Sequence, residues 1–316
     1  MSITFLQKRK IAYFVSGSLL TLSIFSLSTN GLNQGVDFVG GRTYTVRFDK
    51  DVNQSEIQAS LIDVLGNAEA KTFGSDNQLK ITTNYKVDVE GTQVDEEIQT
   101  KMFESLKNVL PENLSYDEFV NGSEDKAIGI MGSSKVGPTI ADDIKKNSFL
   151  AIFGSLFVVF VYILLRFRDW QYSLGAVAAV FHDVLVVLGI FSLTYSFMPF
   201  NMEINQAFIA AVLTVIGYSL NDTVVVFDRI REFRLINKSW EFKKTVNGAL
   251  NSTLSRTLNT SFTTLVVLLA IFLFGGESIR GFMFALIIGV IVGTYSSVFI
   301  ATPVMFDTLK KSLKKS

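Results

Sequence analysis

Runs of apolar residues long enough to cross a membrane constrain this chain more than any other feature. A helix needs about 20 predominantly apolar residues to span a hydrocarbon core of about 30 Å. Five runs meet or approach that length, and they are Phe149–Leu165, Leu174–Phe197, Gln206–Phe227, Asn259–Phe274 and Phe282–Val304. We therefore expect an integral membrane protein built from a bundle of spanning helices.

A sixth run, Ile11–Leu27, is richer in serine and follows the basic residues Lys8–Lys10. A cleaved signal peptide begins in the same way, but no convincing small-x-small cleavage site follows Leu27. We expect an uncleaved first span, which brings the number of spans to six. Residues 1–31 then form the N-terminal tail and this span, and residues 146–309 form a five-helix bundle.

The composition agrees with this class. Only 18% of the residues are charged, whereas soluble domains carry about 25%. The formal net charge is +0, so we expect no nucleic-acid partner. The chain has no cysteine, which excludes disulfide and thiol chemistry.

Basic residues mark alternate connections between the runs. They are concentrated at Lys8–Lys10, Arg166 and Arg168, Arg229–Lys244 and Lys310–Lys315. Because cytoplasmic loops carry an excess of Lys and Arg, both termini are expected in the cytoplasm. Residues 229–250 mix basic and apolar side chains, which predicts an amphipathic helix in the cytoplasmic interface, and residues 310–316 predict a basic cytoplasmic tail.

A polar stretch, Leu32–Lys145, lies between the first two spans and is expected on the outer, periplasmic side. Alternating apolar residues predict strands at 41–48, 68–73 and 78–84, with further strands at 115–120 and 126–131. Helical spacing predicts helices at 53–65 and 92–110. The order β-α-β-β-α-β is that of a ferredoxin-like α+β domain, a fold that says nothing alone about function.

Asp222 stands inside one apolar run and Arg256 inside the next. A charge at the centre of a bilayer costs about 2.5–3.5 kcal/mol even on insertion scales. Two opposite charges on adjacent spans are expected to offset that cost by pairing, and Asp222 is a candidate proton carrier. The alternative for Asp222 is a structural carboxylate that reaches water near the cytoplasmic end of its span.

Polar residues continue along the span that carries Arg256. Asn259, Thr260 and Thr263 fall on the same helical face as Arg256, so this face is expected to meet protein or water rather than lipid. The alternative is that Arg256 snorkels to cytoplasmic phosphates. Snorkelling does not explain the Asn and Thr residues that continue into the membrane.

His182 and Asp183 are adjacent in the third span, and His182 is the only histidine. Small residues precede them, so this end of the helix is expected to pack tightly against protein. His182 is either a satisfied core group or part of a relay. Asp183 is a fixed charge, a relay member or a helix anchor, and the sequence leaves these alternatives open.

The GVDFVGG sequence from Gly35 to Gly41 stands where the first span meets the first strand. Three glycines around one acid and one aromatic predict a sharp turn, with Phe38 buried and the Asp37 carboxylate hydrogen-bonded. Gly40 and Gly41 close this junction motif. The sequence has no Walker A motif, metal-ligand cluster or nucleophile elbow, so ATP hydrolysis and other enzymatic chemistry have no support.

Five segments together resemble one family. They are GVDFVGG at Gly35, KVGPTIADDIKKNS at Lys135, FHDV at Phe181, IGYSLNDTVVVFDRIRE at Ile216 and ALNSTLSRTLNTSFTTL at Ala249. They look like the SecF family, the smaller subunits of the SecD–SecF accessory to the bacterial Sec translocon. Such a subunit is half of a resistance-nodulation-division (RND) type transporter, and the resemblance covers essentially the whole chain.

The resemblance implies a protein of the bacterial inner membrane that uses the proton motive force to promote late translocation of preproteins. It places the family's relay acid at Asp222 and its relay arginine at Arg256, with His182, Asp183, Asn259 and Thr260 as further relay or support positions. The implied partners are SecD, the SecY-E-G translocon, the exported preprotein and further insertase subunits. The resemblance implies no cofactor, because the process is driven by protons. Whether Na⁺ is the coupling ion instead of H⁺ stays open.

Three rival functions remain. One is half of an RND-type lipid or drug exporter, and the small outer domain and the specific motifs argue against it. A clamp that assembles the translocon without transducing energy would use the charges only for stability. An intramembrane aspartyl protease would use Asp183 and Asp222 as its two acids. No GxGD-type sequence surrounds Asp222, and Arg256 beside such a pair would hold both acids ionised, which disfavours the protease.

Overall fold

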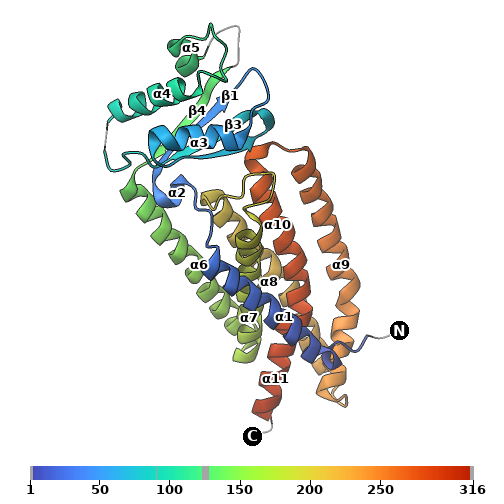
Figure 1. The fold of residues 1–316 in the computed structure, drawn as a ribbon. Helices are drawn as coiled ribbons and strands as arrows, with labels where there is room; N and C mark the ends of the chain where they lie inside the picture. The colour runs from blue at the N-terminus through green and yellow to red at the C-terminus, as the bar shows by residue number, and fades with distance from the viewer. Residues whose placement is uncertain (1–2, 90, 123–127, 314–316) are drawn as a thin grey trace.

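The computed structural model describes residues 3–89, 91–122 and 128–313. A small sheet domain stands at one end of a helical bundle, and both termini lie at the opposite end (Figure 1). Six helices are long and apolar enough to cross a membrane, as the sequence predicted. They are α1 (Arg9–Thr29), α6 (Pro138–Phe167), α7 (Trp170–Thr194), α8 (Gln206–Ile236), α9 (Phe242–Phe274) and the continuous segment Glu277–Lys310.

The last segment contains three elements rather than one regular helix. It begins as α10 (Glu277–Ser296), passes through a π-helical turn, η2 (Ser297–Ala301), and continues as α11 (Thr302–Leu313). The basic tail predicted from residue 310 is therefore helical as far as Leu313, and residues 314–316 lie outside the described part. A short 3-10 turn, η1 (Phe5–Gln7), precedes α1.

The sheet domain has the predicted ferredoxin-like order. Its strands are β1 (Gly41–Arg47), β2 (Glu69–Phe73), β3 (Ser75–Thr83) and β4 (Gly129–Val136), arranged β2-β3-β1-β4 with every neighbouring pair antiparallel. Helices α3 (Gln54–Leu65) and α4 (Gln93–Leu106) cover one face. Asn53 caps α3 by accepting a hydrogen bond from the Ser55 amide at 3.0 Å.

The prediction of a strand at 115–120 was wrong, because this segment is the helix α5 (Tyr116–Asn121). Ser115 and Glu118 form a capping box in which each side chain binds the other residue's backbone amide. The Ser-x-x-Glu spacing is a helix-start signal that outweighs the alternating pattern over so short a segment. The strand predicted at 126–131 corresponds to β4, which begins and ends further along the chain. Residues 126 and 127 of the predicted strand lie outside the described part.

The interfacial helix predicted at 229–250 is also absent from the described chain. Helix α8 continues to Ile236, residues 237–241 form the connection, and α9 begins at Phe242. Asn237 ends α8, and the Trp240 ring packs against Phe233 with centroids 6.3 Å apart. The amphipathic pattern came from two spanning helices that extend beyond the apolar runs and pack against each other.

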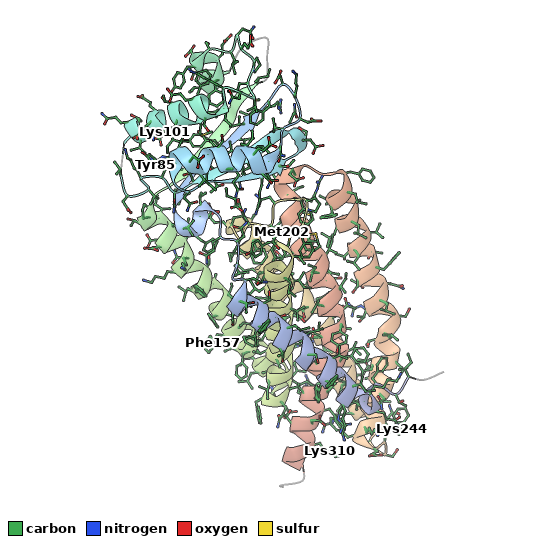
Figure 2. All side chains as sticks on the ribbon, in the orientation of Figure 1. Tyr85, Lys101, Phe157, Met202, Lys244 and Lys310 are labelled. Atoms are coloured by element: carbon green, nitrogen blue, oxygen red, sulfur yellow. The ribbon has the colours of Figure 1, made fainter. Side chains whose placement is uncertain are left out.

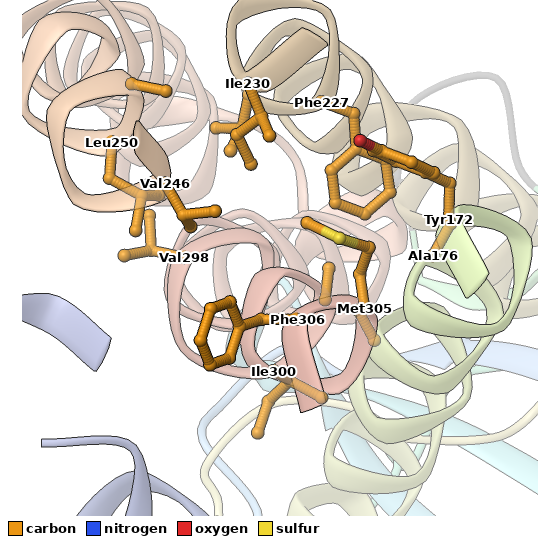
Figure 3. Close-up of a cluster of buried hydrophobic side chains, with 14 of the residues drawn as sticks. Tyr172, Ala176, Phe227, Ile230, Val246, Leu250, Val298, Ile300, Met305 and Phe306 are labelled. Atoms are coloured by element: carbon orange, nitrogen blue, oxygen red, sulfur yellow. The ribbon is translucent and has the colours of Figure 1, made fainter. Parts of the chain in front are cut away.

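Two apolar clusters hold the bundle together. The cluster far from the sheet joins Tyr172, Phe227, Val246, Val298 and Met305 from five elements (Figure 3). The other lies beneath the sheet domain, where Met202 marks the connection from α7 to α8 (Figure 2). Because lipid tails are as apolar as these side chains, the clusters stabilise the bundle through close van der Waals packing rather than through removal of apolar surface from water.

Small residues let α10 approach α8 closely. They recur at every fourth position of α10, as Gly281, Ala285, Gly289 and Gly293, a spacing that is typical of tightly packed membrane helices. A Cβ atom built on Gly289 would lie 2.0 Å from Val215 Cγ2, and one on Gly293 would lie 3.1 Å from Ser219 Cβ. Only glycine at position 289 leaves room for this contact. The stripe therefore packs helices together.

We predict that Gly289→Ala lowers the free energy of unfolding by about 1–3 kcal/mol, because the added methyl overlaps Val215 and forces the helices apart. Gly154→Ala is the matched control, since a Cβ there meets no atom within 4 Å. Thermal unfolding of both variants in the same detergent tests this. Equal melting temperatures would contradict the close-packing account.

Candidate functional site

The most deeply buried charged group of the bundle is Asp183 on α7, whose side chain is 0% exposed. Its Oδ2 accepts hydrogen bonds from Ser219 Oγ on α8 and from Ser296 Oγ on α10, each at 2.7 Å. Its Oδ1 lies 3.0 Å from Nδ1 of His182. Hydrogen bonds of this kind keep a buried carboxylate tolerable, and here they tie three helices together.

His182 connects this cluster toward α1. Its ring lies 6.1 Å from the ring of Tyr295, and the Tyr295 hydroxyl lies 3.0 Å from Ser16 Oγ on α1. The second ring nitrogen, Nε2, is buried and has no hydrogen-bond partner among the described residues. His182 is therefore a core group satisfied on one side only.

The π-helical turn η2 begins directly after Ser296. Such turns are rare and often occur at functional sites, because the extra residue changes which side chains face a neighbour. Thr302 stabilises the turn by donating its hydroxyl to the Ser297 carbonyl at 3.0 Å. The irregularity thus adjoins the residue through which α10 contacts Asp183.

Asp222 lies one turn beyond Ser219 on α8 and is 4% exposed. Its Oδ2 is buried without a hydrogen-bond partner in the described residues, and so is Oγ1 of Thr257 on α9. The guanidinium of Arg256 and the hydroxyl of Thr257 are both close enough to influence the Asp222 carboxylate. Asp222 is therefore held in the bundle with far fewer donors than Asp183.

The predicted direct pairing of Asp222 with Arg256 is not formed, since no ion pair joins these two described side chains. Arg256 and Asn259 are exposed on the outside of α9. The Thr260 hydroxyl donates to the Arg256 carbonyl of its own helix at 2.9 Å. The buried polar stripe of α9 is instead Thr253, Thr257 and Ser261, one position further along.

The junction motif forms a single helical turn, α2 (Val36–Val39). Phe38 is buried, and Asp37 Oδ2 accepts a hydrogen bond of 3.0 Å from the amide of Gln206, the first residue of α8. Gly41 has φ +135°, and a Cβ there would lie 2.6 Å from the Thr83 carbonyl oxygen. The buried aromatic and hydrogen-bonded carboxylate inferred from the sequence are both present.

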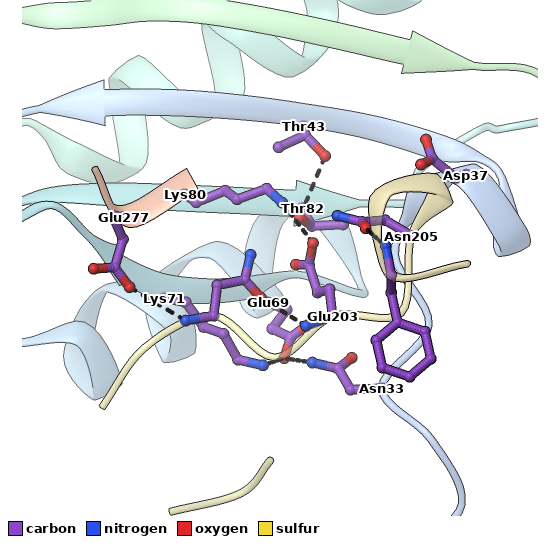
Figure 4. A network of polar contacts seen from close by, with 12 residues as sticks. Asn33, Asp37, Thr43, Glu69, Lys71, Lys80, Thr82, Glu203, Asn205 and Glu277 are labelled. Atoms are coloured by element: carbon purple, nitrogen blue, oxygen red, sulfur yellow. Dashed lines mark hydrogen bonds and ion pairs between the residues drawn. The ribbon is translucent and has the colours of Figure 1, made fainter. Parts of the chain in front are cut away.

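A second set of contacts joins the sheet to the connection just before α8 (Figure 4). Lys80 on β3 pairs with Glu203 at 2.5 Å, and the Glu203 side chain is only 5% exposed. The backbone of Ile204 binds both sides of the linker, donating to Asn33 at 2.7 Å and accepting from Gly35 at 2.9 Å. The start of α8 is therefore fixed through Asp37 to the junction motif, and the connection before it is fixed through Glu203 to the sheet.

Sequence reasoning missed the partners of these acids. Ser219 and Ser296 are ordinary residues of membrane helices, and Lys80 is one of many surface lysines. Glu203 is the single acid of a short, otherwise uncharged connection, residues 197–205. An acid there, close to the membrane surface, is the one signal from which a cationic partner could have been expected.

The fold and these buried charges define a membrane protein with six candidate spanning helices in its described residues and a small sheet domain at one end of the bundle. A family model described as "Protein export membrane protein SecD/SecF, C-terminal" matches residues 118–311, and a SecD/SecF GG motif model matches residues 25–52. A protein translocase subunit SecF of Rhodothermus marinus is 45% identical over 304 residues, covering 96% of this chain and 92% of its own length. The corresponding subunit of Vibrio alginolyticus is 37% identical, with coverages of 95% and 88%.

The chain belongs to the SecD/SecF family of protein-export membrane proteins, where its relatives are the SecF subunits. The crystal structure of SecDF from Thermus thermophilus matches with a TM-score of 0.80 at 28% identity. The match covers 98% of this chain but only 39% of the SecDF chain, so this chain spans about two fifths of that protein. SecDF in a super-membrane-facing form matches with a TM-score of 0.67 at 26% identity.

We predict that Ser219→Ala and Ser296→Ala each lower the free energy of unfolding by about 1.5–3 kcal/mol, because each removes one donor from a buried carboxylate. The double variant should deviate from additivity, since both hydroxyls bind the same oxygen. Ser155→Ala is the control, because the Ser155 hydroxyl binds only the Ile152 carbonyl of its own helix. Equal melting temperatures for Ser219→Ala, Ser296→Ala and Ser155→Ala would show that the two buried serines do not stabilise the Asp183 carboxylate.

Proposed function

We propose that this chain is the SecF half of a SecD–SecF machine that uses the proton motive force to promote late translocation of preproteins through the SecY-E-G channel. The observation that carries the proposal is the placement of Asp222. This acid is buried in a spanning helix with an unpartnered oxygen, on the same helix whose outer end is tied to the sheet domain. A change at Asp222 therefore has a short mechanical path to the outer side.

The outward polar face of α9 supports a protein partner. Arg256 and Asn259 are exposed in a helix that is only 11% buried over its apolar window. A guanidinium and an amide inside a membrane require protein or water around them. The SecD subunit supplies that environment in the proposal, and its own intramembrane acid completes the relay with Asp222 and Arg256.

The working step begins with protonation of Asp222. Neutralising this carboxylate removes its attraction to Arg256, so α8 and α9 shift relative to each other, and release of the proton restores the attraction. Each charge that crosses about 100 mV yields about 2.3 kcal/mol. One or two protons thus bias a conformational step of several kcal/mol, and Na⁺ serves equally if it binds the same carboxylate.

Asp183 has a different role in this mechanism. Its oxygens are already bound by Ser219, Ser296 and His182, so it anchors α8 beside the titrating residue. This arrangement disfavours the aspartyl protease, because no hydrogen bond joins the carboxyls of Asp183 and Asp222 in the described chain. Catalysis by such a pair requires two acids that share a proton.

Both termini are placed in the cytoplasm and the sheet domain in the periplasm. The basic residues at the end of the bundle that carries the termini support this orientation. ATP hydrolysis has no part in the proposal, since the chain needs only an ion gradient. Further insertase subunits and the preprotein are expected to meet the complex through SecD and the channel.

The test of this function compares wild type with Asp222→Asn and Arg256→Ala, each co-assembled with SecD and the translocon in membrane vesicles. We expect both variants to assemble normally and to lose the part of export that depends on the proton gradient. Unchanged export in both variants would remove the relay from this subunit. Failed assembly would favour the clamp, in which the charges only hold the complex together.

Transmission through α8 gives a separate prediction. Lys80→Met leaves Glu203 buried without its cation, so gradient-dependent export should fall, and the charge swap of Lys80→Glu with Glu203→Lys should restore part of it. Lys86→Met is the control, because Lys86 forms an exposed ion pair with Glu97 in the same domain. Asp37→Ala should act like Lys80→Met. Full export in Lys80→Met and Asp37→Ala would show that these contacts transmit nothing.

A further inference from the structure

A narrow apolar groove of about 140 Å³ opens between the outer parts of α6 and α8, beside the linker that leads into α2. Its walls include Ile152 on α6, Leu188 on α7, Ile209 and Val212 on α8, and Phe38 on α2. Pockets for drug-sized ligands measure about 300–1,000 Å³, so a groove of this size encloses only a slender part of a ligand, such as a segment of an acyl chain. It suits a slender apolar chain.

The side of α6 next to the groove faces outward from the bundle. Phe149, which lines the groove, is 57% exposed, and Phe153 and Phe157 further along α6 are 59% and 68% exposed. Phe157 projects from the outer edge of the bundle (Figure 2). In a membrane, exposed phenylalanines on a spanning helix contact lipid. The groove therefore opens toward acyl chains.

One cation stands at the mouth of the groove. Lys145 lines it, is exposed and has no ion pair among the described residues, although Asp142 and Asp143 precede it on α6. Ser148 follows and also lines the groove, and the apolar run begins at Phe149. From outside inward, α6 thus offers an ammonium, a hydroxyl and then apolar side chains.

We propose that this groove binds one acyl chain of a glycerophospholipid whose phosphate is held by Lys145. The order of groups along α6 matches the order of phosphate, glycerol and acyl chain in such a lipid. The charge of Lys145 complements the phosphate, and the groove complements the chain.

The bound chain would lie against Phe38, which belongs to the junction motif. Occupancy of the groove therefore fills the space between α2 and α6, beside the start of α8. A lipid in this position supports the junction from the membrane side. The site itself does not depend on the proposed export function, because it rests only on the groove and on Lys145.

The purified full-length protein in detergent is titrated with dioleoyl phosphatidylglycerol or with dioleoylglycerol, which lacks the phosphate. Bound lipid per protein is counted by native mass spectrometry. We expect the wild type to hold one phosphatidylglycerol tightly. The affinity for this lipid should be about fivefold lower in Lys145→Gln, because one lysine–phosphate contact is lost. The adjacent Lys146→Gln is the control, since Lys146 is exposed but does not line the groove.

A second pair of variants tests the groove itself. Ile152→Trp fills the groove and should remove the tight adduct, whereas Phe153→Trp places the same indole ring outside the groove and should leave binding unchanged. Equal binding by Lys145→Gln and Lys146→Gln would overturn the proposal. So would an unchanged adduct in Ile152→Trp, or dioleoylglycerol bound as tightly as phosphatidylglycerol.

Discussion

A carboxylate in the middle of an apolar bundle must be surrounded by hydrogen-bond donors, and the contacts of Asp183 meet this requirement. Ser219 and Ser296 bring α8 and α10 to α7, and glycines on α10 allow the close approach that these short side chains need. The cost of burying the charge is offset only when the helices are in register. The position of α8, and with it that of Asp222, follows from this constraint.

Helix α8 links the two halves of the molecule. Its middle is fixed by Ser219, its first amide is bound by Asp37, and the connection before it is held by Lys80 through Glu203. Asp222, one turn beyond Ser219, has no comparable anchor among the described residues. A helix that is tied to the sheet domain at its start and to α7 at its middle, with an unsatisfied acid just beyond the second contact, is suited to pass a change of charge to the sheet domain.

The spans, the order of the sheet domain and the identity of the buried acids could be predicted from the sequence, because apolar length and misplaced charge are strong local signals. The rotation of α9 could not. Two polar stripes run along this helix, and only packing decides that Thr257 faces inward while Arg256 faces out. The interfacial helix predicted at 229–250 was wrong for a similar reason. The ends of α8 and α9 pack against each other, and together their residues resemble the pattern of one amphipathic helix.

The outward position of Arg256 agrees with a chain that spans about two fifths of the solved SecDF protein. A polar face on a membrane helix is stable only when it is covered. In the proposed function, these charges form half of a larger site. Asp222 would contribute from the inside of the bundle, and Arg256 would contribute at its surface.

The most direct test follows the sheet domain itself. The chain has no cysteine, so Ser75→Cys on the sheet domain and Leu165→Cys at the far end of α6 accept two spin labels without background. Distances between the labels are measured in vesicles that contain the complex with SecD, with and without a proton gradient. The account predicts that the gradient shifts the distance distribution in the wild type and leaves it fixed in Asp222→Asn. The same shift in Asp222→Asn would contradict the account.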